Sequence, residues 1–364
     1  MPPANDFPPP PGTGGTAPAP QVVVHQASTA FGRYGRYLWL ALGLAAMTIV
    51  GQAASYRSYF SPPDAPQEKY HSRSESARDK IAVLTIAGSI LEGDGFVKRQ
   101  IDRVRDDDHV VAVVARIDSP GGTVTGSDYL LHHLRKLCDD RKLPLVVSMG
   151  GICASGGYYI AMAVGDRPDS IYAEPATWTG SIGVVIPHYD FSGLLTKWEV
   201  RDDSVVSHED KLMGSPTRSL DPQQRAAERD LLQRLVDVSF DRFVDIVKSG
   251  RPQLAEDAEK LQRATTGQIF TADQALELGL VDKIGFVEDA VARAAELAGR
   301  DPEAIRCIKY EQPLPALSRL LAAEAGRGAR QTVGGLDLAG LLDLAAPRAY
   351  YLCTWLPHLL APQP

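Results

Sequence analysis

The chain has 364 residues and a formal net charge of −7 at pH 7, so it is long enough for one large domain or two ordinary ones. It carries no excess of basic residues, and this argues against nucleic-acid binding, because affinity for phosphate depends on Lys and Arg contacts. The four cysteines, Cys138, Cys153, Cys307 and Cys353, show no C-x-x-C pair and no histidine at zinc-site spacing. We therefore expect neither a metal ion nor another cofactor, and we interpret the cysteines as small apolar packing residues.

The N-terminal region divides into a tail and an apolar segment. The first 20 residues contain eight prolines, which predicts a disordered tail over residues 1–32. Residues 37–55 carry no charge and follow Arg33 and Arg36. At about 18 residues, this segment just reaches the length of a transmembrane anchor, and the preceding arginines favour a cytoplasmic N-terminus. A cleaved signal peptide ending near Ser55 is the alternative.

Residues 56–79 are polar and contain proline, which predicts a linker between the membrane and a domain spanning residues 80–300. Within that domain, short apolar runs alternate with helical patterns. Strands are expected at 81–86, 110–114, 143–147, 170–173 and 182–186, and helices at 96–105 and 127–138. This alternation predicts an α/β fold with a mostly parallel sheet.

The second half of the domain is predicted to be helical. Asp221 followed by Pro222 is a strong helix start, and the helix is expected to run to Lys248. Thr271 is expected to cap a shorter helix, and residues 287–298 to form another. Residues 301–364 are a C-terminal extension rich in alanine and leucine, for which the sequence suggests only packing or oligomer contacts.

A single serine stands out in the run from Gly151 to Tyr159, which reads Gly-Ile-Cys-Ala-Ser-Gly-Gly-Tyr-Tyr. The residues before the run form a short apolar stretch, and those after it can continue as a buried helix. Ser155 is therefore predicted to lie at a helix N-terminus beside unpaired N–H groups, where a nucleophile could act. A second glycine-rich strand exit, residues 117–123, could present N–H groups to a developing oxyanion.

Three motifs occur in a characteristic order: Asp118-Ser-Pro-Gly-Gly122, Ala154-Ser-Gly-Gly-Tyr-Tyr159 and Thr179-Gly-Ser-Ile-Gly-Val184. Together they resemble the signal peptide peptidase family SppA, also called protease IV, in its short single-domain form. The resemblance covers roughly residues 80–298. It implies a crotonase-like β-β-α spiral, as in the ClpP proteases, behind one N-terminal transmembrane helix.

A serine nucleophile needs a base within hydrogen-bond reach. The resemblance implies Lys211, which lies in a segment of the family type Ser-x-x-x-Lys-x-x-x-Ser-Pro that begins at Ser207. A lysine base must be neutral near pH 7, and lowering its pKa by three units costs about 4 kcal/mol, which burial can impose. His188 and His208 are the alternative bases, and a solvated surface lysine is the alternative reading of Lys211.

The resemblance assigns three supporting residues. Ser181 matches the family serine that orients the lysine, and the N–H groups of Gly122 and Gly156 are the expected oxyanion hole. The alternative for Ser181 is a serine with only a structural role in a turn. The alternative for Gly122 and Gly156 is an ordinary tight turn without a catalytic role. The thiol of Cys153 is a conceivable competing nucleophile, but its position within the motif corresponds to a packing residue.

The resemblance thus implies a membrane-anchored serine endopeptidase with a Ser/Lys dyad, which degrades signal peptide remnants and other hydrophobic peptides. It also implies a homo-oligomer, an octameric ring in which serine and lysine come from neighbouring copies. We expect a single-pass inner-membrane protein with its catalytic domain on the periplasmic side. A crotonase-type acyl-CoA enzyme and a non-catalytic membrane scaffold of the same fold remain the alternatives.

Overall fold

The computed structural model describes residues 30–60, 65–312 and 350–352, and the chain divides into two units, residues 1–62 and 63–364. The first unit contains helix α1 (Ala30–Phe60), which includes the predicted apolar segment 37–55. Its large apolar side chains between Leu38 and Val50 are exposed. None of the described helices is both long and apolar enough to cross a membrane. Of the predicted tail, residues 30–32 are helical and the rest lies outside the described residues.

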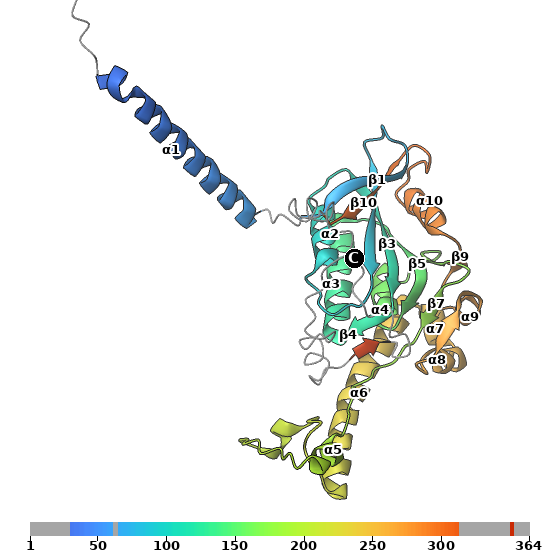
Figure 1. The fold of residues 1–364 in the computed structure, drawn as a ribbon. Helices are drawn as coiled ribbons and strands as arrows, with labels where there is room; N and C mark the ends of the chain where they lie inside the picture. Colours follow the sequence, from blue (N-terminus) through green and yellow to red (C-terminus); the bar gives the residue numbers. More distant parts are fainter. Residues whose placement is uncertain (1–29, 61–64, 313–349, 353–364) are drawn as a thin grey trace, which may run out of the picture. The chain divides into compact units, whose positions relative to one another are not determined.

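The second unit is built on a mostly parallel sheet with the strand order β1-β10-β2-β3-β5-β6-β9 (Figure 1). Only β1 runs antiparallel to its neighbour along this path. The strands are β1 (Gln67–Arg73), β2 (Lys80–Ala87), β3 (Val110–Ser119), β5 (Leu145–Ala154), β6 (Ile171–Ala173), β9 (Lys283–Ile284) and β10 (Arg306–Glu311). The predicted α/β class with a mostly parallel sheet is confirmed.

Four short strands lie off this path, and they surround the candidate site. β7 (Trp178–Gly180) extends the end of β5 in parallel, and β8 (Ile269–Thr271) pairs antiparallel with β7. β4 (Gly121–Thr123) follows β3 and pairs antiparallel with β11 (Tyr350–Leu352).

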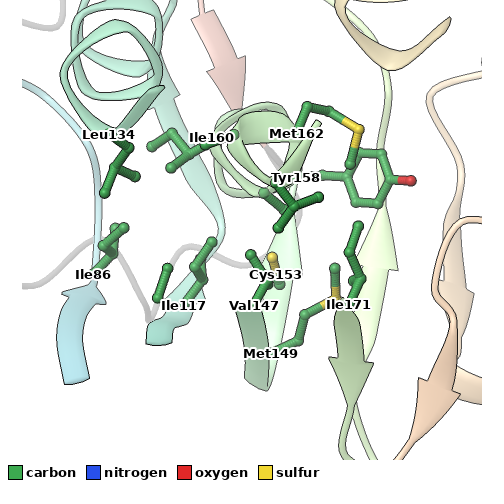
Figure 2. Packing of buried hydrophobic residues seen from close by; sticks show 14 of the residues in the cluster. Ile86, Ile117, Leu134, Val147, Met149, Cys153, Tyr158, Ile160, Met162 and Ile171 are labelled. Carbon is green, nitrogen blue, oxygen red and sulfur yellow. The ribbon is translucent and has the colours of Figure 1, made fainter. Parts of the chain in front are cut away.

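Helices cover both faces of the sheet because side chains alternate along each strand. In β2, Leu84 and Ile86 belong to one core cluster and Ile81 and Val83 to the other. The first cluster packs under α2 (Phe96–Arg105), α3 (Val124–Arg141) and α4 (Gly156–Ala161), and the second under α10 (Val287–Leu297). Figure 2 shows the first cluster, in which side chains of α3 and α4 lie over those of the strands.

The remaining helices follow β7. They are α5 (Ser192–Lys197), η2 (Glu209–Leu212), α6 (Pro222–Gly250), α7 (Pro252–Glu256), α8 (Ala258–Ala264) and α9 (Ala272–Leu278), and η1 (Met162–Val164) extends α4. The predicted caps are present: Asp221 accepts hydrogen bonds from the N–H groups of Gln223 and Gln224, and Thr271 accepts from Gln274. Figure 1 shows α5 and the first part of α6 extending past the end of the sheet; we call residues 184–238 the arm.

Three sequence expectations need correction. Residues 182–186 do not form a strand, because the left-handed backbone of Ser181 (φ 52°) ends the extended run at Gly180. The strand predicted at 143–147 begins only at Leu145, after Pro144, and continues to Ala154. The sheet also exceeds the predicted domain bounds 80–300, since β1 lies in the predicted linker and β10 in the predicted extension. β1 is polar and largely exposed, so it lacks the apolar pattern of the inner strands.

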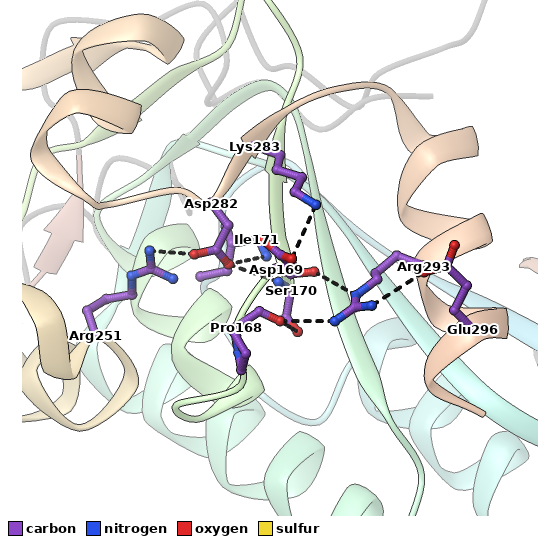
Figure 3. A network of polar contacts seen from close by, with 9 residues as sticks. All are labelled: Pro168, Asp169, Ser170, Ile171, Arg251, Asp282, Lys283, Arg293 and Glu296. Atoms are coloured by element: carbon purple, nitrogen blue, oxygen red, sulfur yellow. Dashed lines mark hydrogen bonds and ion pairs between the residues drawn. The ribbon is translucent and has the colours of Figure 1, made fainter. Parts of the chain in front are cut away.

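A polar network fixes the start of β6 (Figure 3). One carboxylate oxygen of Asp282 accepts from the N–H groups of Ser170 and Ile171, each at 2.9 Å, and its other oxygen accepts from Arg251 at 2.7 Å. The Arg251 and Asp282 side chains are only 10% and 14% exposed. This pair ties the end of α6 and the residue before β9 to the loop between η1 and β6.

Candidate active site

Ser155 occupies the junction between β5 and α4, as predicted from its motif. Its backbone is strained, with φ 55° and ψ −117°, a region that residues other than glycine rarely adopt. The N–H of Ser155 donates to the carbonyl oxygen of Gly180 at 2.8 Å, and its own carbonyl accepts from Tyr159 at 2.9 Å. Strain of this kind costs about 1–3 kcal/mol and is typical of residues held for a function.

The hydroxyl of Ser155 is buried, and it makes no hydrogen bond that would give it a structural role in the described part of the chain. The residue is 1% exposed, its side chain does not cap α4, and its Oγ has no hydrogen-bond partner in the described part of the chain. A buried polar atom without a partner needs an explanation. A hydroxyl kept free for a base and a substrate provides one.

The two expected oxyanion donors, Gly122 and Gly156, lie next to each other. A Cβ built on Gly156 would lie 3.2 Å from the nitrogen of Gly122. Gly156 is in the first turn of α4, where N–H groups lack an acceptor within the helix. At Gly122 a Cβ would come within 1.9 Å of the carbonyl oxygen of Ile90, so only glycine fits. The structure therefore brings both donors to the side of Ser155.

The Asp118 to Gly122 motif holds this geometry through two side chains for which no separate role was predicted. Ser119 Oγ accepts from the N–H of Gly121 at 3.1 Å and donates to the carbonyl of Gly88 at 2.6 Å. Asp118 accepts from the N–H of Ile152 in β5 at 3.0 Å. These contacts fix the turn between β3 and β4 against β5, the strand that leads to Ser155. The motif could have indicated these two roles, because Asp and Ser before a Pro-Gly-Gly turn are residues that commonly form local hydrogen bonds to the backbone.

Ser181 also lies at the site. It directly follows Gly180, which holds the Ser155 N–H, and its own N–H donates to the carbonyl of Gln268 at 2.6 Å. Ser181 is 7% exposed and has a left-handed backbone. Two serines in strained conformations thus lie at the ends of two paired strands, β5 and β7.

Lys211 is on the arm, in the short helix η2, and its side chain is exposed. In the described part of one chain it makes no contact with Ser155, and no hydrogen bond or ion pair involves its Nζ. The two alternative bases have acidic neighbours on the arm rather than Ser155: His188 Nε2 lies 3.7 Å from Glu228, and His208 Nδ1 lies 3.5 Å from Asp210. The described part of one chain therefore brings Ser155, Ser181, Gly122 and Gly156 together, and within it none of the three candidate bases is paired with Ser155.

Glu228 is a buried acid on α6 that the sequence did not single out. Its Oε1 accepts from the N–H of Gly214 at 2.9 Å, three residues after Lys211. His188 and Arg218 lie within 4 Å of the same carboxylate. Glu228 therefore ties the loop that carries Lys211 to the long helix α6.

Cys153 has the packing role predicted for it. It is fully buried in β5 and points into the core among Val147, Tyr158 and Ile171 (Figure 2). Burial, with a contribution from Asp118, raises the pKa of its thiol. Because the thiolate is the reactive form of cysteine, this thiol is a poor competitor of Ser155.

Comparison with known families and sequences gives a consistent result. Residues 138–301 match the profile of peptidase family S49. The chain is 39% identical over 250 residues to a Synechocystis sp. protein named as a candidate protease. The aligned residues cover 69% of this chain and 86% of that protein. It is 32% identical over 281 residues to Protease 4 of Haemophilus influenzae, covering 74% of this chain and 43% of that protein.

A chloroplastic serine protease SPPA of Arabidopsis thaliana is 29% identical over 282 residues, covering 73% of this chain and 39% of that protein. The chain thus spans less than half the length of the Haemophilus and Arabidopsis proteins. Among solved structures, a membrane-bound stomatin-specific protease in complex with a substrate peptide aligns with a TM-score of 0.40 and 16% identity, covering 68% of this chain and 98% of that chain.

Proposed function

Because this chain belongs to peptidase family S49 and is a serine peptidase, we propose that it is a membrane-anchored endopeptidase in which Ser155 and Lys211 form a catalytic dyad. The observation that carries the proposal is the state of Ser155: a buried hydroxyl without a described partner, on a strained backbone, beside two glycine N–H donors. We further propose that the sheet forms the crotonase-like spiral of that family. A crotonase-type acyl-CoA enzyme and a non-catalytic scaffold do not explain why the hydroxyl is kept free.

The proposed reaction has two steps. Neutral Lys211 takes the proton of Ser155 Oγ as the oxygen attacks a peptide carbonyl, and the N–H groups of Gly122 and Gly156 stabilise the oxyanion. The C–N bond then breaks, the amine leaves with the proton from Lys211, and an ester on Ser155 remains. Water, deprotonated by Lys211, hydrolyses the ester and returns the enzyme. Ser181 is proposed to accept a hydrogen bond from the lysine amine and to orient it.

Lys211 is proposed to reach Ser155 of a neighbouring copy. The support is the position of Lys211 on the arm, away from the serine of its own chain, and the apolar character of the arm. Several large apolar side chains are exposed there: Tyr189, Phe191, Leu194, Trp198, Leu235 and Val238. Exposed apolar patches of this kind mark protein contacts. A closed ring, an octamer by family resemblance, would bury them and complete every site.

Hydrophobic peptides, including signal peptide remnants, are the proposed substrates. A cavity of about 420 Å³ lies beside β4 and is lined mainly by apolar residues, among them Ile86, Ile90, Leu91, Phe96 and Leu130. Ile90 contacts β4 directly, because its carbonyl accepts from the N–H of Thr123 at 2.8 Å. An apolar side chain of an extended substrate could occupy this cavity.

Anchoring at the inner membrane, with the N-terminus cytoplasmic, is the remaining part of the proposal. It is supported by the uncharged run 37–55, the arginines before it and the exposed apolar side chains of α1. Membrane fractionation of the full chain and of a form lacking residues 1–60 tests it. Recovery of both forms in the same fraction would contradict it.

The subunit-crossing dyad is tested by complementation. Inactive Ser155→Ala and Lys211→Ala chains are mixed under conditions that allow subunits to exchange, and exchange is measured separately with two labels. A site with Ser155 from one copy and Lys211 from the other should regain part of the peptidase activity. Exchange without any recovered activity would mean that each chain uses its own lysine or a different base.

A further inference from the structure

The long helix α6 has two halves that differ in burial. In the first half, residues 222–238, only Glu228 and Leu232 are buried. The buried residues of the second half recur every three or four positions and form one stripe, namely Phe243, Val247 and Gly250. This half contacts α4 and η1, and the rings of Phe243 and Tyr159 meet edge to face with their centroids 5.1 Å apart. α6 therefore leaves the body of the domain just before Phe243 and continues into the arm.

A polar cluster lies where α6 leaves the body. Oδ1 of Asp128 on α3 accepts hydrogen bonds from Arg242 and from the hydroxyl of Tyr159, each at 2.7 Å. Tyr159 is fully buried on α4, and its main-chain N–H donates to the carbonyl of Ser155 at 2.9 Å. A single carboxylate oxygen thus joins the base of the arm to α3 and to the helix that begins at Ser155.

The position of this cluster gives it leverage over Lys211. Glu228, which holds the Lys211 loop, lies about 21 Å along α6 from Arg242 at a rise of 1.5 Å per residue, so a tilt of about 5° at Arg242 moves that loop by about 2 Å. A displacement of about 1 Å can lower a catalytic rate about 100-fold. Arg242 is 57% exposed, and exposed ion pairs contribute little to folding. Its loss should therefore act on the direction of the arm more than on stability.

We propose that Arg242, Asp128 and Tyr159 form a joint that sets the direction of the arm, and that Arg242 is a positioning residue for Lys211. This inference rests on the proposed function, because it concerns the placement of the proposed base. The joint itself is a statement about geometry, and it can be measured without any turnover.

The direction of the arm is measured by the distance between two spin labels in one chain. Non-natural ketone residues at positions 108 and 223 carry the labels, and labelled chains are diluted with unlabelled chains so that only distances within one chain are observed. Asp108 is 99% exposed on the body of the domain, and Gln223 is exposed at the start of α6. In Arg242→Ala we expect the distance distribution from double electron–electron resonance to shift or broaden by about 2–3 Å.

Lys248→Ala is the matched control for this measurement. It removes an exposed ion pair with Asp245 that lies wholly within α6, so the distance should stay as in the unmodified chain. Arg242→Lys keeps a cation beside Asp128 and should restore most of the original distribution. Equal distributions in Arg242→Ala and the unmodified chain would overturn the joint.

The kinetic effect should follow the geometry. With an internally quenched apolar peptide as substrate, we expect kcat to fall about tenfold in Arg242→Ala at nearly constant KM, to recover in Arg242→Lys, and to be unchanged in Lys248→Ala. All three variants should unfold at nearly the same urea concentration as the unmodified chain. A loss of kcat in proportion to a loss of stability would reduce Arg242 to a structural residue.

Mixed assemblies show on which partner the joint acts. In a mixture of Ser155→Ala and Lys211→Ala chains, the first supplies the lysine and the second the serine. Arg242→Ala added to the lysine-supplying chain should lower the recovered activity about tenfold, whereas in the serine-supplying chain it should have little effect. Equal losses in both mixtures, or a loss confined to the serine-supplying chain, would contradict a role in placing Lys211.

The two proposals fail separately. If the label distance changes in Arg242→Ala but no form of the chain cleaves peptides, the joint stands and the proposed dyad fails. If the unmodified chain cleaves peptides through Ser155 and Lys211 while the label distance and kcat are the same in Arg242→Ala, the dyad stands and the joint fails.

Discussion

Gly156 lies so close to Ser127 that a Cβ on the glycine would be 2.4 Å from the serine Oγ. Ser127 is fully buried on α3, and its hydroxyl donates to the carbonyl of Thr123 at 2.9 Å, so a rotation of this side chain would break a buried hydrogen bond. The turn that carries Ser155 is thus wedged between α3 and the loop that carries Gly122. This packing holds Gly122 and Gly156, the proposed oxyanion donors, in place.

Gly156→Ala should therefore lower the free energy of unfolding by about 1–3 kcal/mol through overpacking, and lower kcat by moving the donor at residue 156. Adding Ser127→Ala removes the clashing oxygen and should restore part of both quantities. Chemical denaturation and steady-state kinetics on the single and double variants measure this. Additive losses in the double variant would show that the two residues do not interact in this way.

Glu228 should act on catalysis through the loop that carries Lys211. Glu228→Ala leaves the Gly214 N–H without its acceptor, and the displaced lysine should lower kcat by about 10–100-fold. Glu228→Gln keeps an oxygen at the same place and should recover most of the activity. Steady-state kinetics on both variants measure this. An unchanged kcat in Glu228→Ala would show that Glu228 does not position Lys211.

The network in Figure 3 should contribute strongly to stability. Asp282→Ala leaves Arg251 and two N–H groups without their shared acceptor and should lower the free energy of unfolding by about 3–5 kcal/mol. Lys283→Ala, the matched control, removes an exposed ion pair with Asp169 and should cost about 1 kcal/mol or less. Urea denaturation of both variants tests this, and equal losses would contradict it.

Cys153 should remain unreactive in the folded enzyme. Its thiol is fully buried and its pKa is raised, so it stays protonated at pH 8 to 9, where an ordinary thiol of pKa about 8.5 ionises. Iodoacetamide in this pH range should leave peptidase activity unchanged and Cys153 unmodified by mass spectrometry. Rapid inactivation that Cys153→Ala prevents would show that the thiol is accessible after all.

The sequence predicted the parts of this molecule that depend on local pattern. The apolar runs of β2 and β3, the caps Asp221 and Thr271, and the turn between strand and helix at Ser155 all follow from neighbouring residues. The polar edge strand β1 escaped prediction because it has no apolar face to reveal it.

The pairing of β11 with Gly122 joins residues more than 200 positions apart, and no local pattern encodes it. The role of Glu228 depends in the same way on a loop and a helix that meet only in the folded chain.

We propose that Ser155 is the nucleophile and that Lys211 activates it. A peptidyl phosphonate that traps active serines, followed by peptide mass mapping, tests it most directly. We expect one adduct on Ser155 in the unmodified chain, none in Ser155→Ala, and strongly slowed labelling in both Lys211→Ala and Lys211→Arg, because a guanidinium cannot accept a proton. An adduct on another residue, or labelling of the Lys211 variants at the unmodified rate, would contradict the account.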